Sequence, residues 1–226
     1  MKRKMSLAQK VNILRASVMG ANDGIISVAG IVIGVAAATQ NPFAILISGL
    51  AGSLAGTISM AAGEYISVST QKDSQKMALA VEGQRLKNDY ASEFSFVKQK
   101  YLDQSIDPEL AQAATQQLMD KDPIGTVVQE RYGFNPREYT SPYDAAIASF
   151  ISFPIGSILP IVAVTISPVH LRIWMTMLAV TFMLIITGYT AAVLGGSDRW
   201  KSAFRNVIAG LITMLITFVI GQLFAH

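Results

Sequence analysis

The sequence predicts an all-α integral membrane protein with five transmembrane helices and a small helical cytoplasmic insert between the second and third of them. Hydrophobic residues make up 51% of the 226 residues and charged residues only 15%, whereas about a quarter of a soluble domain is charged. The charges are also segregated, because 20 of the 33 lie between Lys72 and Glu138. The rest of the chain is apolar enough to require lipid.

Five apolar segments are each long enough to cross a bilayer, which takes about 20 residues of helix. A link as short as Thr39–Pro42 predicts that consecutive segments are antiparallel neighbours. The segments cover residues 18–39, 43–67, 145–166, 173–194 and 203–224. We therefore expect three parts: the first two spans in 1–71, a cytoplasmic helical domain in 72–141 and the last three spans in 142–226.

Basic residues near the ends of the spans predict the orientation of the chain, because Lys and Arg concentrate in cytoplasmic loops. They occur before the first span and between the fourth and fifth, at Lys2, Arg3, Lys4, Lys10, Arg15, Arg199, Lys201 and Arg205. These regions and the insert are therefore predicted to be cytoplasmic, and His226 to lie outside. The compact chain favours the cell membrane of a prokaryote.

Residues 1–38 also have features of a secretory signal peptide, with a basic start, an apolar middle and small residues at 36–38. However, the apolar stretch is longer than a typical signal core, and the pair Asn22 and Asp23 near its start is foreign to one. A first helix that stays in the membrane is the preferred interpretation.

The insert is predicted to be helical. No Gly or Pro occurs between Glu64 and Glu82, so the second span is expected to continue into the cytoplasm as one long helix. A further helix is expected over 92–104. Two more have start signals at Asp107-Pro108 and Asp122-Pro123, where an acid caps the helix and Pro follows it, and the second is expected to stop at Gly133.

The motifs of common enzymes are absent. The chain has no P-loop, no zinc-protease HExxH and no nucleophile elbow, and it contains only two His and no Cys. We therefore predict that the protein is not an enzyme and carries no cofactor. Its basic residues flank the apolar spans, which is typical of topology signals rather than of a nucleic-acid partner.

Asp23 is an acid inside the first apolar span, where a carboxylate costs about 2.5 to 3.5 kcal/mol and so faces a cavity that handles a cation or a proton. At 1.5 Å of rise per residue, Asp23 lies about 24 Å from Thr39, and Met60 of the second span lies about 27 Å from Pro42. A carboxylate and a thioether at similar depth suit a soft or borderline first-row metal ion.

Two further residues complete this candidate metal path. Glu64 follows Met60 by four residues, so it lies on the same helical face and nearer the cytoplasm, where it would admit the cation or exchange a proton. Asn22 would add an amide oxygen.

Each candidate also has a purely structural explanation. Met60 could be packing, Glu64 could sit at the membrane interface, and Asp23 could cap a helix that is broken between Gly20 and Gly24.

Small residues and prolines predict how the spans pack. Gly52 and Gly56 have the spacing that lets membrane helices approach closely, within one chain or across a dimer, and Gly49 and Ser53 lie beside them. In the third span Pro154 and Pro160 are expected to kink the helix.

Two ordered segments, GANDGIIS at 20–27 and GEYISVSTQ at 63–71, closely resemble the vacuolar iron transporter family, and the similarity extends over nearly the whole chain. The resemblance implies a homodimer that exchanges Fe²⁺, and often Mn²⁺, for protons along a path at the dimer interface. It also implies that Asp23 and Met60 are the path residues of that family.

The insert departs from what this resemblance implies, which is a set of glutamates and a Met pair that gather metal. Glu82 matches the first glutamate and stays a candidate metal ligand, whereas Arg85, Phe96, Gln99, Val127, Val128 and Arg131 stand where other ligands are expected. With eleven acids and nine bases, the insert cannot concentrate cations strongly. We expect it to act in dimerisation and gating.

The sequence thus predicts an exporter of divalent Fe²⁺ or Mn²⁺ that works by proton antiport past Asp23 and Met60, as a homodimer in membrane lipid. The alternative is a membrane-anchored sensor or scaffold whose insert binds a protein partner.

Overall fold

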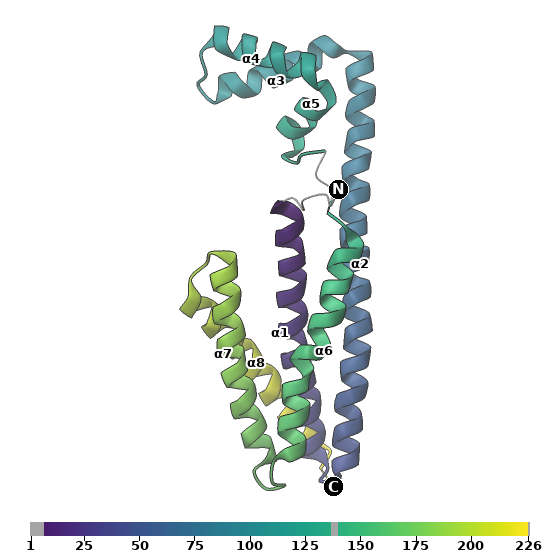
Figure 1. Ribbon diagram of the computed structural model, residues 1–226, viewed down its shortest axis with the longest axis vertical. Coiled ribbons are helices and arrows are strands. Elements are labelled where there is room, and N and C mark those ends of the chain that lie inside the picture. Colours follow the sequence, from purple (N-terminus) through teal and green to yellow (C-terminus); the bar gives the residue numbers. More distant parts are fainter. Residues whose placement is uncertain (1–6, 137–139, 226) are drawn as a thin grey trace, which may run out of the picture. The chain divides into compact units, whose positions relative to one another are not determined.

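The computed structural model describes residues 7–136 and 140–225, and every regular element in them is a helix (Figure 1). The eight helices are α1 Leu7–Ala38, α2 Pro42–Asn88, α3 Tyr90–Asp103, α4 Pro108–Lys121, α5 Pro123–Tyr132, α6 Pro142–Ile166, α7 Arg172–Gly195 and α8 Arg199–Leu223. The predicted helical fold class is confirmed.

Five of these helices, α1, α2, α6, α7 and α8, are long and apolar enough to cross a membrane. They coincide with the five predicted spans, and α3, α4 and α5 fall between the second and third of them. The protein is therefore a multi-pass integral membrane protein. Helix α2 continues for 47 residues without interruption, as the absence of Gly and Pro after Glu64 predicted.

The chain forms two compact units. One comprises Met1–Gln9 and Ser67–Ser141, and the other comprises Lys10–Ile66 and Pro142–His226. We call the first the insert unit and the second the membrane unit. Helix α2 contributes its first half to the membrane unit and its second half to the insert unit.

Helix α1 is the central helix of the membrane unit (Figure 1). One side of it packs Ile25, Ala29 and Ile33 against α7 and α8. Another side packs Val28 and Val32 against Ile45 of α2 and against Phe153 and Val164 of α6. The stretch of α1 from Ile25 to Ile33 therefore lies close to several other spans.

Small residues let these spans approach closely within one chain, as the sequence predicted. A Cβ atom added to Gly49 would lie 2.8 Å from Val32 of α1, and the hydroxyls of Ser53 and Ser157 form a 2.6 Å hydrogen bond between α2 and α6. Helix α6 continues through Pro154 and Pro160 as one helix.

The insert unit has the predicted helix caps. The carboxylate of Asp107 accepts from the backbone N–H of Glu109, and that of Asp122 accepts from Gly125, while Gly133 ends α5 in the left-handed conformation at φ 71°. Its helices share a small core of Leu86, Val97, Met119 and Val127.

Candidate metal path

Asp23 lies in an unbroken stretch of α1, so it does not cap a broken helix. The glycines around it serve packing instead. A Cβ atom on Gly24 would collide with the backbone oxygen of Phe153, and one on Gly156 would collide with the backbone oxygen of Ala21. The backbones of α1 and α6 are therefore in close contact beside Asp23.

The carboxylate of Asp23 is half-buried and accepts a 2.5 Å hydrogen bond from the hydroxyl of Ser27, one helical turn later. Among the residues that the structure describes, no cationic side chain forms an ion pair with it. Ser27 stands at the i+4 position that faces Asp23, and this helical spacing is the sequence signal that could have predicted the contact. Asp23 thus has a polar neighbour and, within the described part of the chain, no counter-charge.

Asn22 points to a different side of α1. Its side-chain oxygen accepts a 3.2 Å hydrogen bond from Thr187 of α7 and a 3.1 Å hydrogen bond from Asn206 of α8. This polar cluster joins three spans, and its two other members were missed because sequence alone does not pair residues 165 and 184 positions apart. The oxygen that was predicted to bind metal is already used by two donors.

Met60 is half-buried on α2 and packs against the apolar cluster that Val28, Val32 and Phe153 form with their neighbours. Its thioether therefore lies on the side of α2 that meets α1 and α6. This placement agrees with a packing role for Met60. It also places the sulfur on the side of α2 that faces α1, the helix that carries Asp23.

Glu64 is buried, with 5% exposure, and forms a two-pronged ion pair with Arg15 of α1. The Arg15 Nη2 donates to Oε2 at 2.7 Å and Nη1 donates to Oε1 at 3.2 Å. Glu64 is therefore no free interfacial acid. From sequence alone Arg15 is only an orientation signal, because nothing there pairs residues 49 positions apart.

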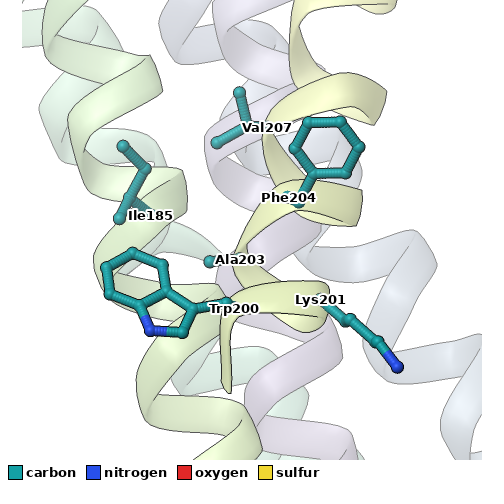
Figure 2. A pocket seen from close by; sticks show the side chains of 6 residues that line it. All are labelled: Ile185, Trp200, Lys201, Ala203, Phe204 and Val207. Atoms are coloured by element: carbon teal, nitrogen blue, oxygen red, sulfur yellow. The ribbon is translucent and has the colours of Figure 1, made fainter. Parts of the chain in front are cut away.

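An apolar pocket of about 500 Å³ between α7 and α8 offers no alternative site for a cation (Figure 2). Of the described residues that line it none is an acid, and the charged group among them is the amine of Lys201, which extends away from the aromatic rings in the view. The pocket is lined by Ile185, Trp200, Lys201, Ala203, Phe204 and Val207.

Glu82 of the insert unit is fully buried and belongs to a network of ion pairs. It pairs with Arg85 at 3.0 Å and with Arg131 at 3.4 Å, and it accepts a 2.9 Å hydrogen bond from the hydroxyl of Tyr132, which raises the pKa of that tyrosine. Arg131 also pairs with Glu93 at 2.5 Å. Two guanidinium groups thus compete with any cation at Glu82.

Across 7–136 and 140–225, no three His, Cys, Asp or Glu side chains gather into a group that could hold a metal ion. The three candidate acids lie instead in three separate settings: Asp23 with Ser27, Glu64 with Arg15, and Glu82 with the arginines of the insert unit.

Comparison with known sequences identifies the family. The sequence pattern of the VIT family matches residues 14–222, which is most of the chain. The chain belongs to the VIT family. Arg15, Asp23, Met60, Glu64 and Glu82 all lie inside the matched region.

Curated relatives of this VIT family chain agree with that assignment. It is 33% identical over 214 residues to "Vacuolar iron transporter" of Acanthamoeba castellanii, covering 93% of this chain and 78% of that protein. It is 33% identical over 211 residues to "Vacuolar iron transporter homolog 1" of Arabidopsis thaliana, with 93% and 82% covered. It is also 34% identical over 213 residues to "Vacuolar iron transporter homolog 2" of Oryza sativa subsp. japonica, with 94% and 90% covered.

Membership in the VIT family also bears on the expectation about catalysis. Proteins of this family are transporters and not enzymes, so the prediction that the chain has no enzymatic activity is confirmed.

Proposed function

We propose that this VIT family chain exports a divalent transition metal ion, Fe²⁺ or Mn²⁺, from the cytoplasm in exchange for protons. The observation that carries the proposal is the carboxylate of Asp23, which is half-buried in the central span without a cationic partner among the described residues. The relatives named as iron transporters support the choice of cargo.

Exchange follows from the chemistry of a lone carboxylate. A charged acid in a membrane costs several kcal/mol, so Asp23 is stable only while it holds a proton or a cation. A carboxylate must lose its proton before it binds a metal ion, and metal binding therefore releases a proton. A carboxylate that binds either a metal ion or a proton, but not both at once, couples metal movement in one direction to proton movement in the other.

Met60 and Glu64 would supply the other steps of the path. A thioether favours a soft or borderline ion over Mg²⁺ or Ca²⁺, which take oxygen ligands, so Met60 would contribute to selectivity. Glu64 would receive the ion from the cytoplasm, and it must first release Arg15. Asn22 would hold the helices around the path through its bonds to α7 and α8 rather than contribute its oxygen.

A second copy of the chain would complete the ligand set. Sites for first-row metals take about four to six donors, and one chain offers Asp23 and Met60. Two chains that meet at the face formed by Asp23 of α1 and Met60 of α2 would together offer two carboxylates and two thioethers. We therefore propose a homodimer in membrane lipid.

The insert, proposed as residues 72–141, would act in dimerisation and gating. Glu82 would bind a metal ion only in a state in which Arg131 has moved away, because the buried carboxylate otherwise has two guanidinium partners. We propose that the parts 1–71 and 142–226 carry the transport path, that the N-terminus and the insert face the cytoplasm, and that His226 lies outside.

Metal-driven proton movement in proteoliposomes tests the transport proposal. When Fe²⁺ or Mn²⁺ is added outside wild-type proteoliposomes, metal entry should expel protons, so a trapped pH dye should report that the lumen becomes more alkaline, and Asp23→Asn should abolish the signal. The matched control is Asp73→Asn, an exposed acid on α2 that pairs only with Lys76 among the described residues. A wild-type protein that stays silent under a pH gradient contradicts the proposal.

A membrane-anchored sensor or scaffold is the second candidate. It is favoured by the insert carboxylates Glu82 and Glu93, which pair with arginines of the insert itself and so are not free to gather metal. In that case the same proteoliposomes would be silent with every cation, and the insert would capture a specific protein from the cell.

For location, we propose the cell membrane of a prokaryote. Fractionation that finds the protein in an internal membrane would overturn this.

A further inference from the structure

A polar cavity of about 640 Å³ lies in the membrane unit, at the end where α1 and α8 stop and α7 begins. Side chains from all three helix ends line it, among them Thr39, Gln40, His170, Arg172 and Gln222. Among the described residues that line it there is no acid, and their charged or chargeable groups, Arg172 and His170, are bases. The cavity is thus separate from the candidate metal path and has the opposite charge.

Arg172 is the group in this cavity that needs a partner. The residue is buried, with 7% exposure, and its Nε has no hydrogen-bond acceptor. No residue within the described ranges forms an ion pair with its guanidinium, which lines the cavity. Arginine keeps its charge at any physiological pH, and a buried charge without a counter-charge is strongly unfavourable.

The amino end of α7, which lies at the same cavity, adds a positive electrostatic potential. Arg172 is the first residue of α7, and the preceding residue, Leu171, makes no side-chain cap. The first turn of α7 contains no acid. The amino end of a helix carries a partial positive charge and unpaired N–H groups that favour anions. An arginine at this position adds to the positive potential instead of cancelling it.

We propose that this cavity is a binding site for a phosphate group. The guanidinium of Arg172 would form charge-assisted hydrogen bonds to the phosphate oxygens, the first turn of α7 would add its N–H groups, and His170 would lie at the exposed rim. The phosphate has two possible sources at the edge of a membrane, the headgroup of a phospholipid and free inorganic phosphate. The site lies at the opposite end of α1 from Arg15 and makes no use of the metal path.

The test uses the full-length protein purified in detergent. Its thermal unfolding is followed while inorganic phosphate is titrated at constant ionic strength against chloride, and native mass spectrometry counts the phospholipids that remain bound. The variant is Arg172→Gln. The matched control is Arg205→Gln, which removes the same charge from an exposed position on α8.

Binding of free phosphate predicts a saturable rise in the unfolding temperature of wild type and Arg205→Gln, with an affinity at least about tenfold weaker in Arg172→Gln. Binding of a lipid headgroup predicts a retained phospholipid that Arg172→Gln loses and Arg205→Gln keeps, with phosphate acting only after that lipid is removed. Either result supports the site.

The proposal is overturned if wild type shows neither a phosphate effect nor a retained phospholipid, or if Arg172→Gln and Arg205→Gln lose binding equally. Should Arg172→Gln fail to fold, Arg172→Lys and His170→Gln replace it. Both are expected to weaken binding while the chain stays folded, and unchanged binding in both would also overturn the site.

Discussion

Arg15 of α1 and Glu64 of α2 form a two-pronged ion pair in which the acid is buried and the base is half-exposed. The side chain of Glu64 has 5% exposure and that of Arg15 has 44%. Arg15 also donates to the side-chain oxygen of Asn12 at 3.1 Å and to the sulfur of Met19 at 3.2 Å. A cation that reaches Glu64 must therefore displace a guanidinium group that is held from several sides.

Replacing Arg15 by Gln should lower the KM for metal, because Glu64 then no longer has an internal competitor. The pair is partly exposed, so it is worth up to about 1 kcal/mol, or about fivefold in affinity. Glu64→Gln should raise the KM, and the double variant should resemble Glu64→Gln. Initial transport rates in proteoliposomes at varied metal concentration measure these values.

Lys10→Gln is the control for the Arg15 variant, since it removes an exposed positive charge from the same helix. If Lys10→Gln lowered the KM as much as Arg15→Gln, the effect would come from the surface charge and not from the ion pair.

Gly24→Ala should destabilise the membrane unit, because the added methyl group would collide with the backbone oxygen of Phe153. Overpacking of this kind costs about 1 to 3 kcal/mol, so the thermal unfolding midpoint in detergent should fall. Gly63→Ala is the matched control: it lies in a helix with nothing within 4 Å of the added Cβ, and Ala is the better helix former by about 0.5 to 1 kcal/mol. Its midpoint should stay equal or rise, and a fall in both variants would refute the contact.

The sequence predicted the elements of this fold because their signals are local. Length and apolar character gave the five spans, and the pairs Asp107-Pro108 and Asp122-Pro123 gave the starts of α4 and α5, since a cap acts on its own helix. The glycines around Asp23 suggest a broken helix when the sequence is taken alone. Their close contact with α6 becomes visible only once the position of α6 is known.

The candidate site was less predictable because its partners are distant in sequence. A helix presents residues in all directions, and periodicity does not say which span faces which side chain. Asn22 was thus assigned to metal although Thr187 and Asn206 use its oxygen, and Arg15 was not recognised as the partner of Glu64.

Met60→Leu should separate the packing role of Met60 from its proposed ligand role. The substitution nearly conserves volume, so stability should change by less than about 1.5 kcal/mol. Loss of the soft sulfur should slow transport of Co²⁺ or Fe²⁺ more than that of the harder Mn²⁺. Met177→Leu, in the other apolar cluster of the membrane unit, should leave the transport rates of all three ions unchanged. Equal slowing of all three ions would contradict a selective role for the sulfur.

Arg131→Met should destabilise the insert unit, because Glu93 loses its partner and Glu82 loses one of two guanidinium groups. Breaking such a buried pair should cost up to about 3 kcal/mol, and the contact of Arg131 with the ring of Phe96, at 4.0 Å, is lost as well. The chain has no Cys, so a single fluorophore on Gln117→Cys of α4 reports unfolding of this unit alone.

Lys76→Met is the control for the Arg131 variant, since its pair with Asp73 is exposed and worth no more than about 1 kcal/mol. An insert that tolerated Arg131→Met as well as Lys76→Met would show that the ion-pair network contributes little.

The stability of the insert unit should fall as the pH rises from 10 to about 12. Burial and the hydrogen bond to Glu130 raise the pKa of Tyr101 from its ordinary value of 10.0 to about 12, and the bond to Glu82 raises the pKa of Tyr132 in the same direction. Over this range the folded chain holds protons that the unfolded chain has lost, so unfolding becomes easier with rising pH, and the full stabilisation is present below pH 10. Tyr101→Phe should reduce this decline in the fluorescence assay, whereas Tyr90→Phe, at an exposed position on α3, should keep it. A decline of unchanged size in Tyr101→Phe would assign the effect to other groups.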